Sequence, residues 1–151
     1  MDEVDLLRWP KPLPPVWRWE RVDPEDGWAE AYRVSEDGAD RGTVQLAFAA
    51  QHAVGASYPA GLRDMILSPS DDAPAEALQL VSEAVMAADR HCRRLVLAAP
   101  EGDVPAVARG EEAGYRYVVD VDLPSGAYSL LVAEPGWVLE ESKNIDEIPT
   151  A

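Results

Sequence analysis

The first residues that could do chemistry lie in the stretch "ILSPSDDAPAEALQLV", residues 66–81, where an apolar run gives way to a helical pattern. A strand-to-helix junction often binds a phosphate group, because backbone N–H groups and the positive end of the helix dipole point out of it. This junction carries Asp71, Asp72 and Glu76 but no glycine, lysine or arginine. It is therefore either an anion site with unfavourable charge or a helix start that acidic residues stabilise.

Other reactive side chains are few. Cys92 is the single cysteine, so no internal disulfide can form, and its place at the end of an apolar stripe predicts a core residue rather than a nucleophile. His52 and His91 lie far apart, and no Cys/His cluster has metal-ligand spacing. We therefore expect no metal site, and no Ser/His/Asp arrangement can be assigned.

Composition restricts the partners. The chain has 151 residues, 47% of them apolar, and a formal net charge of −15. This charge argues against nucleic acid or an anionic membrane as a partner, since both require a basic surface, and favours a cationic small molecule or a basic protein. The first residues lack the cationic and apolar parts of a signal peptide, and no apolar run approaches the ~20 residues of a membrane span, so we expect a cytoplasmic protein.

The elements that must position these residues alternate between strand and helix patterns. Leu78, Val81 and Val85 recur at helical spacing, with Asp71 or Asp72 as the expected cap. The sequence predicts strands over residues 16–22, 31–35, 43–49, 62–68 and 93–100, a short helix from Asp103 to a stop at Gly114, and a hairpin over 115–135 with its turn at "PSG".

The ends of the chain differ from the middle. Residues 1–15 form a Pro- and Trp-rich arm, residues 16–138 a single domain, and residues 139–151 a polar, acidic tail that we expect to be flexible. The tryptophans either cover one edge of the core or dock the arm onto a partner protein.

The order of elements over residues 31–133 resembles that of the GNAT acyltransferases. The resemblance rests on three features: the triplet Leu67-Ser68-Pro69 before a long helix, a buried strand over 94–98, and Gly114-Tyr115 after a short helix. The resemblance implies an α/β (α+β) fold: a mixed, mostly antiparallel central sheet, with a long helix after the fourth strand and a short helix before the C-terminal hairpin.

The resemblance also implies a cofactor, acetyl-CoA or another acyl-CoA. The thioester would lie against the strand that ends at Leu67 and Ser68, with the diphosphate on the next helix. The family's diphosphate loop, Gln/Arg-x-x-Gly-x-Gly/Ala, registers here on Asp72, Ala75 and Ala77. Its binding groups would be the backbone amides of four residues: Ala73, Ala75, Glu76 and Ala77.

Catalytic positions of the family match less well. The Asn that often starts its short helix corresponds to Asp103, and the Tyr that protonates the departing thiolate corresponds to Gly110. Asp64 corresponds to a place in the family's fourth strand that helps to deprotonate the acceptor amine. Because Arg63 is next to it, the simpler interpretation is a solvated strand residue. A base there would need burial to raise its pKa.

Two functions remain open at this point. The first is an acyl-CoA-dependent N-acyltransferase acting on a basic amine such as a polyamine, an aminoglycoside or a lysine-rich peptide. Residues 23–30 leave too little room for the two helices with which the family encloses its acceptor, so the arm or a second subunit of a homodimer would have to complete the pocket. The second is a catalytically silent GNAT-like domain that binds a protein partner through its acidic surface or its arm.

Overall fold

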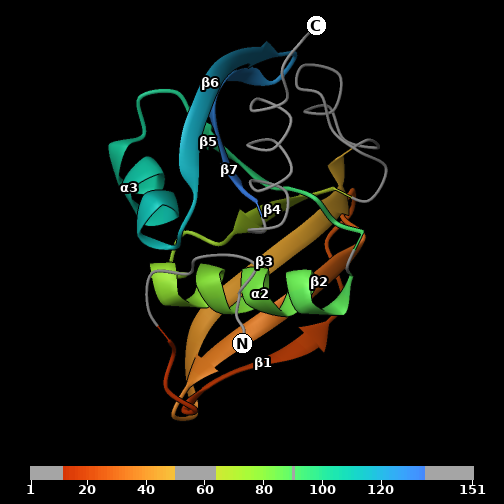
Figure 1. The fold of residues 1–151 in the computed structure, drawn as a ribbon, viewed down its shortest axis with the longest axis vertical. Coiled ribbons are helices and arrows are strands. Elements are labelled where there is room, and N and C mark those ends of the chain that lie inside the picture. The colour runs from red at the N-terminus through yellow and green to blue at the C-terminus, as the bar shows by residue number, and fades with distance from the viewer. Residues whose placement is uncertain (1–11, 50–63, 90, 135–151) are drawn as a thin grey trace, which may run out of the picture.

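The structure is a computed structural model that describes residues 12–49, 64–89 and 91–134. The described residues form one sheet in the order β1-β2-β3-β4-β5-β7-β6, in which only β4 and β5 pair in parallel (Figure 1). The strands are β1 (Trp17–Val22), β2 (Glu30–Glu36), β3 (Ala39–Phe48), β4 (Met65–Pro69), β5 (Leu95–Pro100), β6 (Arg116–Leu123) and β7 (Gly126–Ala133), and the helices are α2 (Ala75–Ala88) and α3 (Val104–Glu112).

This architecture confirms the predicted fold class: a mixed, mostly antiparallel sheet with a long helix after β4 and a short helix before the hairpin of β6 and β7. The connection between β1 and β2 contains no helix. Most of the predicted arm and the whole of the predicted tail lie outside the described residues, so the proposed division of the chain stays a prediction.

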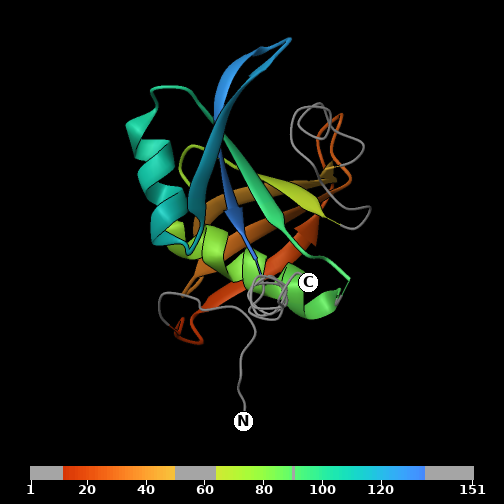
Figure 2. The same ribbon diagram turned by 45° about the horizontal axis from the view of Figure 1, so that its top comes forward.

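Both helices pack on the same face of the sheet. α2 crosses the strands β1 to β3, and α3 lies against β5, β6 and β7, with the first turn of α2 next to α3 (Figures 1 and 2). The main core cluster lies between this face and the helices and includes Leu46, Leu67, Leu78, Leu97 and Leu131. A smaller cluster around Ile66, Val96 and Leu130 lies on the other face.

Helix α2 buries the stripe that its spacing predicts, with Leu78, Val81 and Val85 all in the main cluster. Its start differs from the prediction. The N-cap residue is Pro74, and no side chain caps the helix. The carboxylate of Asp72 instead accepts a hydrogen bond from Ser70 Oγ, at 2.6 Å, so the predicted cap by Asp71 or Asp72 is wrong.

The end of α2 also differs slightly, because the helix stops at Ala88 and Cys92 lies beyond it. Cys92 is nevertheless 1% exposed and belongs to the main core cluster. Burial raises the pKa of its thiol to about 12. Since the thiolate is the reactive form, the structure supports a core residue rather than a nucleophile.

Helix α3 begins and ends as predicted. Asp103 is the N-cap, and its Oδ1 accepts a hydrogen bond from the N–H of Ala106 at 3.1 Å. Pro105 lies in the first turn, where its missing N–H removes no helical bond. Gly114 follows the last turn with φ +107°, a left-handed conformation that glycine adopts without strain.

Glu134, just past β7, gives the fold a pH dependence. Its Oε1 accepts from Arg116 Nη2 at 2.7 Å and its Oε2 from Arg94 Nε at 3.0 Å. Burial raises the pKa of Glu134, but the hydrogen bonds and charges of Arg116 and Arg94 outweigh burial and leave the pKa below its ordinary value of 4.5. The ion pairs therefore stabilise the fold above the unfolded-state pKa and are lost as pH falls through the folded-state pKa.

We expect Glu134→Gln to lower the free energy of unfolding at pH 7 by about 1–2 kcal/mol, because the arginines keep only a neutral acceptor. Urea unfolding at pH 7, 5, 4 and 3 measures this difference. The gap between wild type and variant should shrink below about pH 4, where the wild-type carboxyl takes up its proton. A gap that stays constant with pH would assign the effect to packing instead of charge.

Candidate functional site

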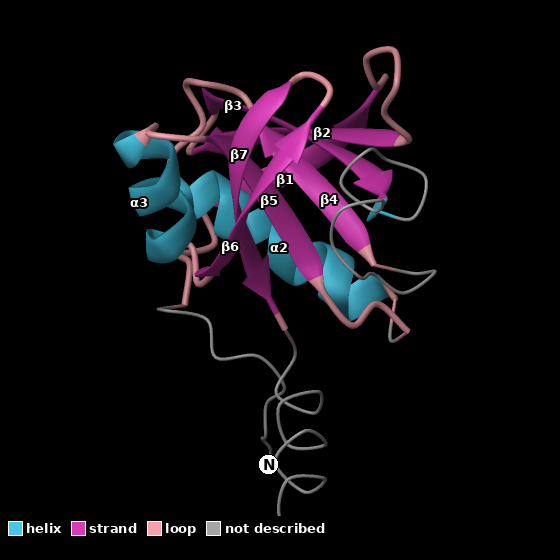
Figure 3. Cartoon of the chain, turned by 90° about the horizontal axis from the view of Figure 1, so that it is seen from above, coloured by secondary structure: helices cyan, strands magenta, loops and turns pink. Residues whose placement is uncertain are grey.

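The sheet opens between β4 and β5. Their ladder holds three residue pairs, from Met65–Leu95 to Leu67–Leu97, and then ends. Both strands continue past that point, β4 to Pro69 and β5 to Pro100. The chain leaves β4 towards α2 on one half of the sheet and leaves β5 towards α3 on the other half (Figure 3). A crevice at the carboxyl ends of parallel strands whose connections diverge is the usual ligand site of α/β sheets.

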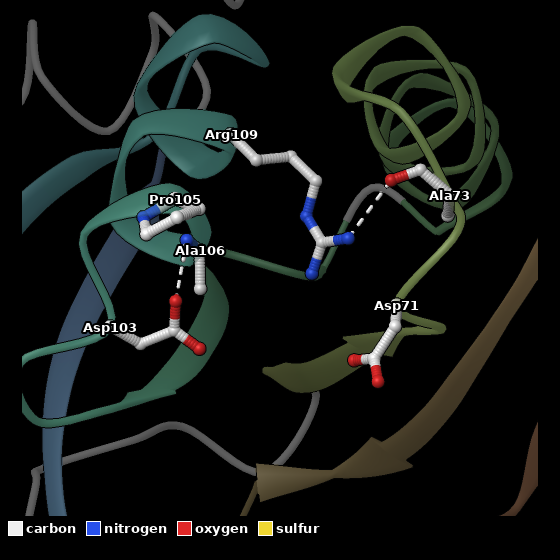
Figure 4. Close-up of a pocket in the computed structure, with 6 residues that line it drawn as sticks. All are labelled: Asp71, Ala73, Asp103, Pro105, Ala106 and Arg109. Atoms are coloured by element: carbon white, nitrogen blue, oxygen red, sulfur yellow. Dashed lines mark hydrogen bonds between the residues drawn. The ribbon is translucent and has the colours of Figure 1, made fainter.

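A cavity of about 280 Å³ lies between the connections that follow these two strands. One wall comes from the connection between β4 and α2, and the other from the start and outer side of α3 (Figure 4). Its lining residues are Asp71, Ala73, Asp103, Pro105, Ala106 and Arg109. Its volume is large enough for a diphosphate and a short adjoining segment, and smaller than most sites that enclose a whole ligand.

The loop between β4 and α2 is fastened to β3. Ser70 donates its N–H to the carbonyl of Thr43 at 2.7 Å, and the N–H of Thr43 donates to Ser70 Oγ at 3.0 Å. Gly42 passes so close that a Cβ there would lie 2.9 Å from Ala73 Cα and 2.7 Å from Ser70 Oγ. Its φ of +94° also favours glycine. The loop is thus held in one shape before any ligand binds.

Arg109 fastens the same loop from the other side. Its Nη1 donates to the carbonyl oxygens of Ser70 at 3.0 Å and Ala73 at 2.9 Å. Figure 4 shows the side chain reaching from α3 across the cavity towards Ala73, with the carboxylates of Asp103 and Asp71 on opposite walls. The cavity therefore contains one cation and two acids, of which Asp103 already caps α3.

The predicted diphosphate amides divide into two groups. The N–H of Ala73 donates to the carbonyl of Ser70 at 3.0 Å, and that of Ala77 to the carbonyl of Pro74 at 3.1 Å. These two amides thus already have hydrogen-bond partners within the chain. Ala75 is the first helical residue, so its N–H group has no carbonyl one turn back in the helix. The amide of Ala75 is therefore suited to an anion.

The other predicted cofactor residues lie close to the crevice. Leu67 is buried and forms the last pair of the β4–β5 ladder, and Ser68 is the next residue, partly exposed beyond it. Ala73 and Asp103 line the cavity itself. Asp72 does not line the cavity, whereas Asp71, its neighbour, does. Of the two adjacent loop acids, Asp71 is therefore the one that would face a ligand.

Asp64 lies at the opposite end of β4 from the cavity, about 16 Å along the strand from Pro69 at ~3.3 Å per residue. It is 1% exposed, so the expectation of a solvated residue is wrong. Its Oδ1 accepts hydrogen bonds from the N–H groups of Arg93 at 2.9 Å and Arg94 at 3.0 Å. Its visible role is to hold the start of β5 beside β4.

Among the residues that the structure describes, no tyrosine, histidine or cysteine lines the cavity. Gly110, at the place of the family's acid, is buried, and a Cβ there would lie 2.9 Å from Leu97 Cδ1 and 3.2 Å from Leu131 Cδ2. Tyr115 is buried, its hydroxyl lies 2.6 Å from Ser82 Oγ, and burial raises its pKa. This tyrosine belongs to the core and has no access to the cavity.

Within the described part of the chain, no group of three or more His, Cys, Asp or Glu side chains is arranged to hold a metal ion. The two helices of that part are too short and too polar to cross a membrane.

Comparison with known proteins places the fold. No family model matches the sequence, and no curated protein is significantly similar to it. Solved structures do match. An uncharacterized protein from Bacillus halodurans has a TM-score of 0.65 and 13% identity, over 78% of this chain and 64% of that one. The aminoglycoside acetyltransferase AAC(6')-Ib in complex with coenzyme A has a TM-score of 0.63 and 14% identity, over 76% of this chain and 70% of that one.

A related structure, the aminoglycoside N-acetyltransferase AAC(6')-Ib11, has a TM-score of 0.58 and 15% identity, over 70% of this chain and 65% of that one. The chain thus spans about two thirds of the length of these proteins. At such identities the likeness concerns the fold alone. It confirms the GNAT-like fold inferred from the sequence.

Proposed function

We propose that the chain is an acyl-CoA-dependent N-acyltransferase whose acyl-CoA site is the crevice between β4 and β5. The observation that carries this proposal is the ladder that ends at Leu67 and Leu97 beside a cavity of about 280 Å³. Beyond that point β4 still pairs with β3 and β5 with β7, but the facing edges of β4 and β5 no longer pair with each other, so an extended acyl-bearing arm could bond to them. Acetyltransferases with the same fold have been solved with coenzyme A bound, which supports the choice of ligand.

The residues at the crevice fit a diphosphate in part. The N–H group of Ala75 and the dipole of α2 favour an anion, and no side chain caps this helix in competition. Ala73 leaves room beside this N–H group. Asp71 opposes an anion, with a like-charge repulsion of about 1 kcal/mol at ~4 Å in water. We therefore expect binding that is weaker than a glycine-rich loop would give.

The proposed reaction needs few groups from the protein. Bound acyl-CoA supplies an activated acyl group: the acceptor nitrogen forms a C–N bond to the thioester carbon, the C–S bond breaks, and the leaving thiolate takes a proton. The amine proton passes to water. Because neither Gly110 nor a lining side chain can supply a proton, catalysis would depend mainly on holding the two reactants together.

The acceptor we propose is a basic amine, such as a polyamine, an aminoglycoside or a lysine-rich peptide. The net charge of −15 attracts cations over long range and raises the rate at which they reach the surface. The cytoplasm is the compartment we propose for this reaction.

Acetyl-CoA at millimolar concentration is expected to raise the melting temperature. A ligand at ~100 times its Kd stabilises a protein by about 2.7 kcal/mol, which corresponds to about 5–10 °C for a chain of this size. Differential scanning calorimetry measures the shift, with adenosine as the matched control because it lacks the diphosphate and the thioester. A shift within error of zero would contradict the proposed function.

A catalytically silent domain is the second candidate, favoured by the buried Gly110 at the position of the acid. Release of free thiol from acetyl-CoA in the presence of spermidine, kanamycin or a lysine-rich peptide separates the two candidates. Thiol release above the rate without protein supports the enzyme. A thermal shift without thiol release for any amine class supports a domain that binds acyl-CoA and does not turn it over.

A further inference from the structure

We propose that Arg109 binds the diphosphate, and so supplies from α3 the cation that the β4–α2 loop lacks. This inference rests on the proposed function and names a specificity-determining residue of the same site. The loop and the first turn of α2 carry Asp71, Asp72 and Glu76 and no basic residue. Any cation for a phosphate must therefore come from another element, and Arg109 lines the cavity.

The hydrogen bonds of Arg109 leave most of its donors open. A guanidinium has five N–H donors. The two N–H groups of Nη1 donate to the carbonyls of Ser70 and Ala73. The remaining three, on Nε and Nη2, have no protein acceptor, and no carboxylate forms an ion pair with Arg109 among the described residues.

The two carbonyls hold the side chain without neutralising it. Backbone carbonyls are dipoles, so the full positive charge stays available at the cavity. Anchoring through Nη1 also fixes the plane of the guanidinium, which removes part of the entropy that a free arginine loses on binding. A guanidinium fixed in this way presents its remaining N–H donors in one plane, which suits the bidentate contacts that arginine makes with phosphate oxygens.

The geometry of α3 directs Arg109 to this place. Gly110 turns towards the sheet, where Leu97 and Leu131 leave no room for a Cβ. Pro105, Ala106 and Arg109, at spacings of three and four residues, share the neighbouring side that lines the cavity. From this side of α3 the guanidinium reaches across the cavity towards Ala73, as Figure 4 shows.

Arg109 and Asp71 should therefore have opposite effects on affinity. Isothermal titration calorimetry of the full chain measures its affinities for acetyl-CoA, acetyl-pantetheine and inorganic pyrophosphate and so tests this expectation. Arg109→Gln is expected to weaken acetyl-CoA binding about 10- to 100-fold, the equivalent of a hydrogen-bonded charge. Asp71→Asn, the matched control at the facing wall, is expected to tighten it about 2- to 5-fold. Acetyl-pantetheine, which lacks the diphosphate, should bind both variants within twofold of wild type.

A merely structural role for Arg109 predicts a different pattern. If the side chain only braced the loop, Arg109→Gln would weaken acetyl-CoA and acetyl-pantetheine equally, and this result would overturn the inference. The salt dependence gives a second readout, since the loss of a phosphate contact lowers the slope of log Kd against log salt concentration. Arg109→Lys, which keeps the charge, should recover part of the affinity for acetyl-CoA.

Failure of the proposed function gives a distinct result. Wild type that binds no acetyl-CoA contradicts acyl transfer, but pyrophosphate still tests Arg109. Pyrophosphate binding by wild type that Arg109→Gln abolishes would support Arg109 as a ligand of another phosphate compound. Wild type that binds neither ligand would overturn the inference as well, as would unchanged affinities in Arg109→Gln.

Discussion

Replacing Asp64 by alanine is expected to lower the free energy of unfolding by about 2–4 kcal/mol. The carboxylate is buried, and one of its oxygens accepts hydrogen bonds from two successive backbone N–H groups, those of Arg93 and Arg94. Truncation leaves both donors without this acceptor, at about 1–3 kcal/mol for each group that water cannot reach. Urea unfolding followed by circular dichroism measures the loss.

Asp64→Asn is the matched control, because its amide oxygen can still accept from at least one of the two N–H groups. We expect it to lose about half as much stability as the alanine variant. Acyl transfer per folded molecule should stay within threefold of wild type, since Asp64 lies at the far end of β4 from the cavity. A stable Asn variant that loses most of its kcat would restore Asp64 as the general base.

Gly42→Ala is expected to cost about 2–4 kcal/mol and to abolish the thermal response to acetyl-CoA. A left-handed conformation costs an alanine about 1–2 kcal/mol. The added Cβ would also lie 2.9 Å from the backbone Cα of Ala73, so the loop between β4 and α2 must move. Because that loop forms one wall of the cavity, its displacement changes the site.

Gly38→Ala separates the two effects of the Gly42 substitution. Gly38 has a similar φ of +85°, but a Cβ there would meet nothing within 4 Å. The Gly38→Ala variant should lose only the conformational part of the unfolding free energy, about 1–2 kcal/mol, and keep its thermal response to acetyl-CoA. Calorimetry of the three proteins with and without acetyl-CoA gives both quantities. An undiminished response in Gly42→Ala would show that the loop wall does not contribute to binding.

Local patterns predicted the elements well because each depends on residues near one another in the chain. The spacing of Leu78, Val81 and Val85 predicted α2, and Asp103 with Gly114 predicted both ends of α3. The order of these elements was enough for the fold class. The start of α2 was mispredicted because Asp72 bonds to Ser70, whose position depends on Thr43 in a distant strand.

The site was less predictable than the fold. Arg109 lies 36 residues from Ala73 and in no motif, so only the meeting of α2 and α3 reveals their contact. The hydrogen bonds of the Ala73 and Ala77 N–H groups depend on the path of one loop, which sequence spacing does not define. Asp64 looked solvated because its neighbour Arg63 is charged, although its buried acceptor role is set by the register of β4 against β5.

The short ladder between β4 and β5 joins two halves of the sheet, called lobes below, which share one hydrophobic core. Three residue pairs join them, compared with five between β3 and β4 and six between β5 and β7. Asp71 and Ala73 belong to one lobe, and Ala106 and Arg109 to the other. Arg109 therefore connects the two lobes through its hydrogen bonds to Ser70 and Ala73. A phosphate compound bound by both lobes would add a second connection and restrict their relative motion.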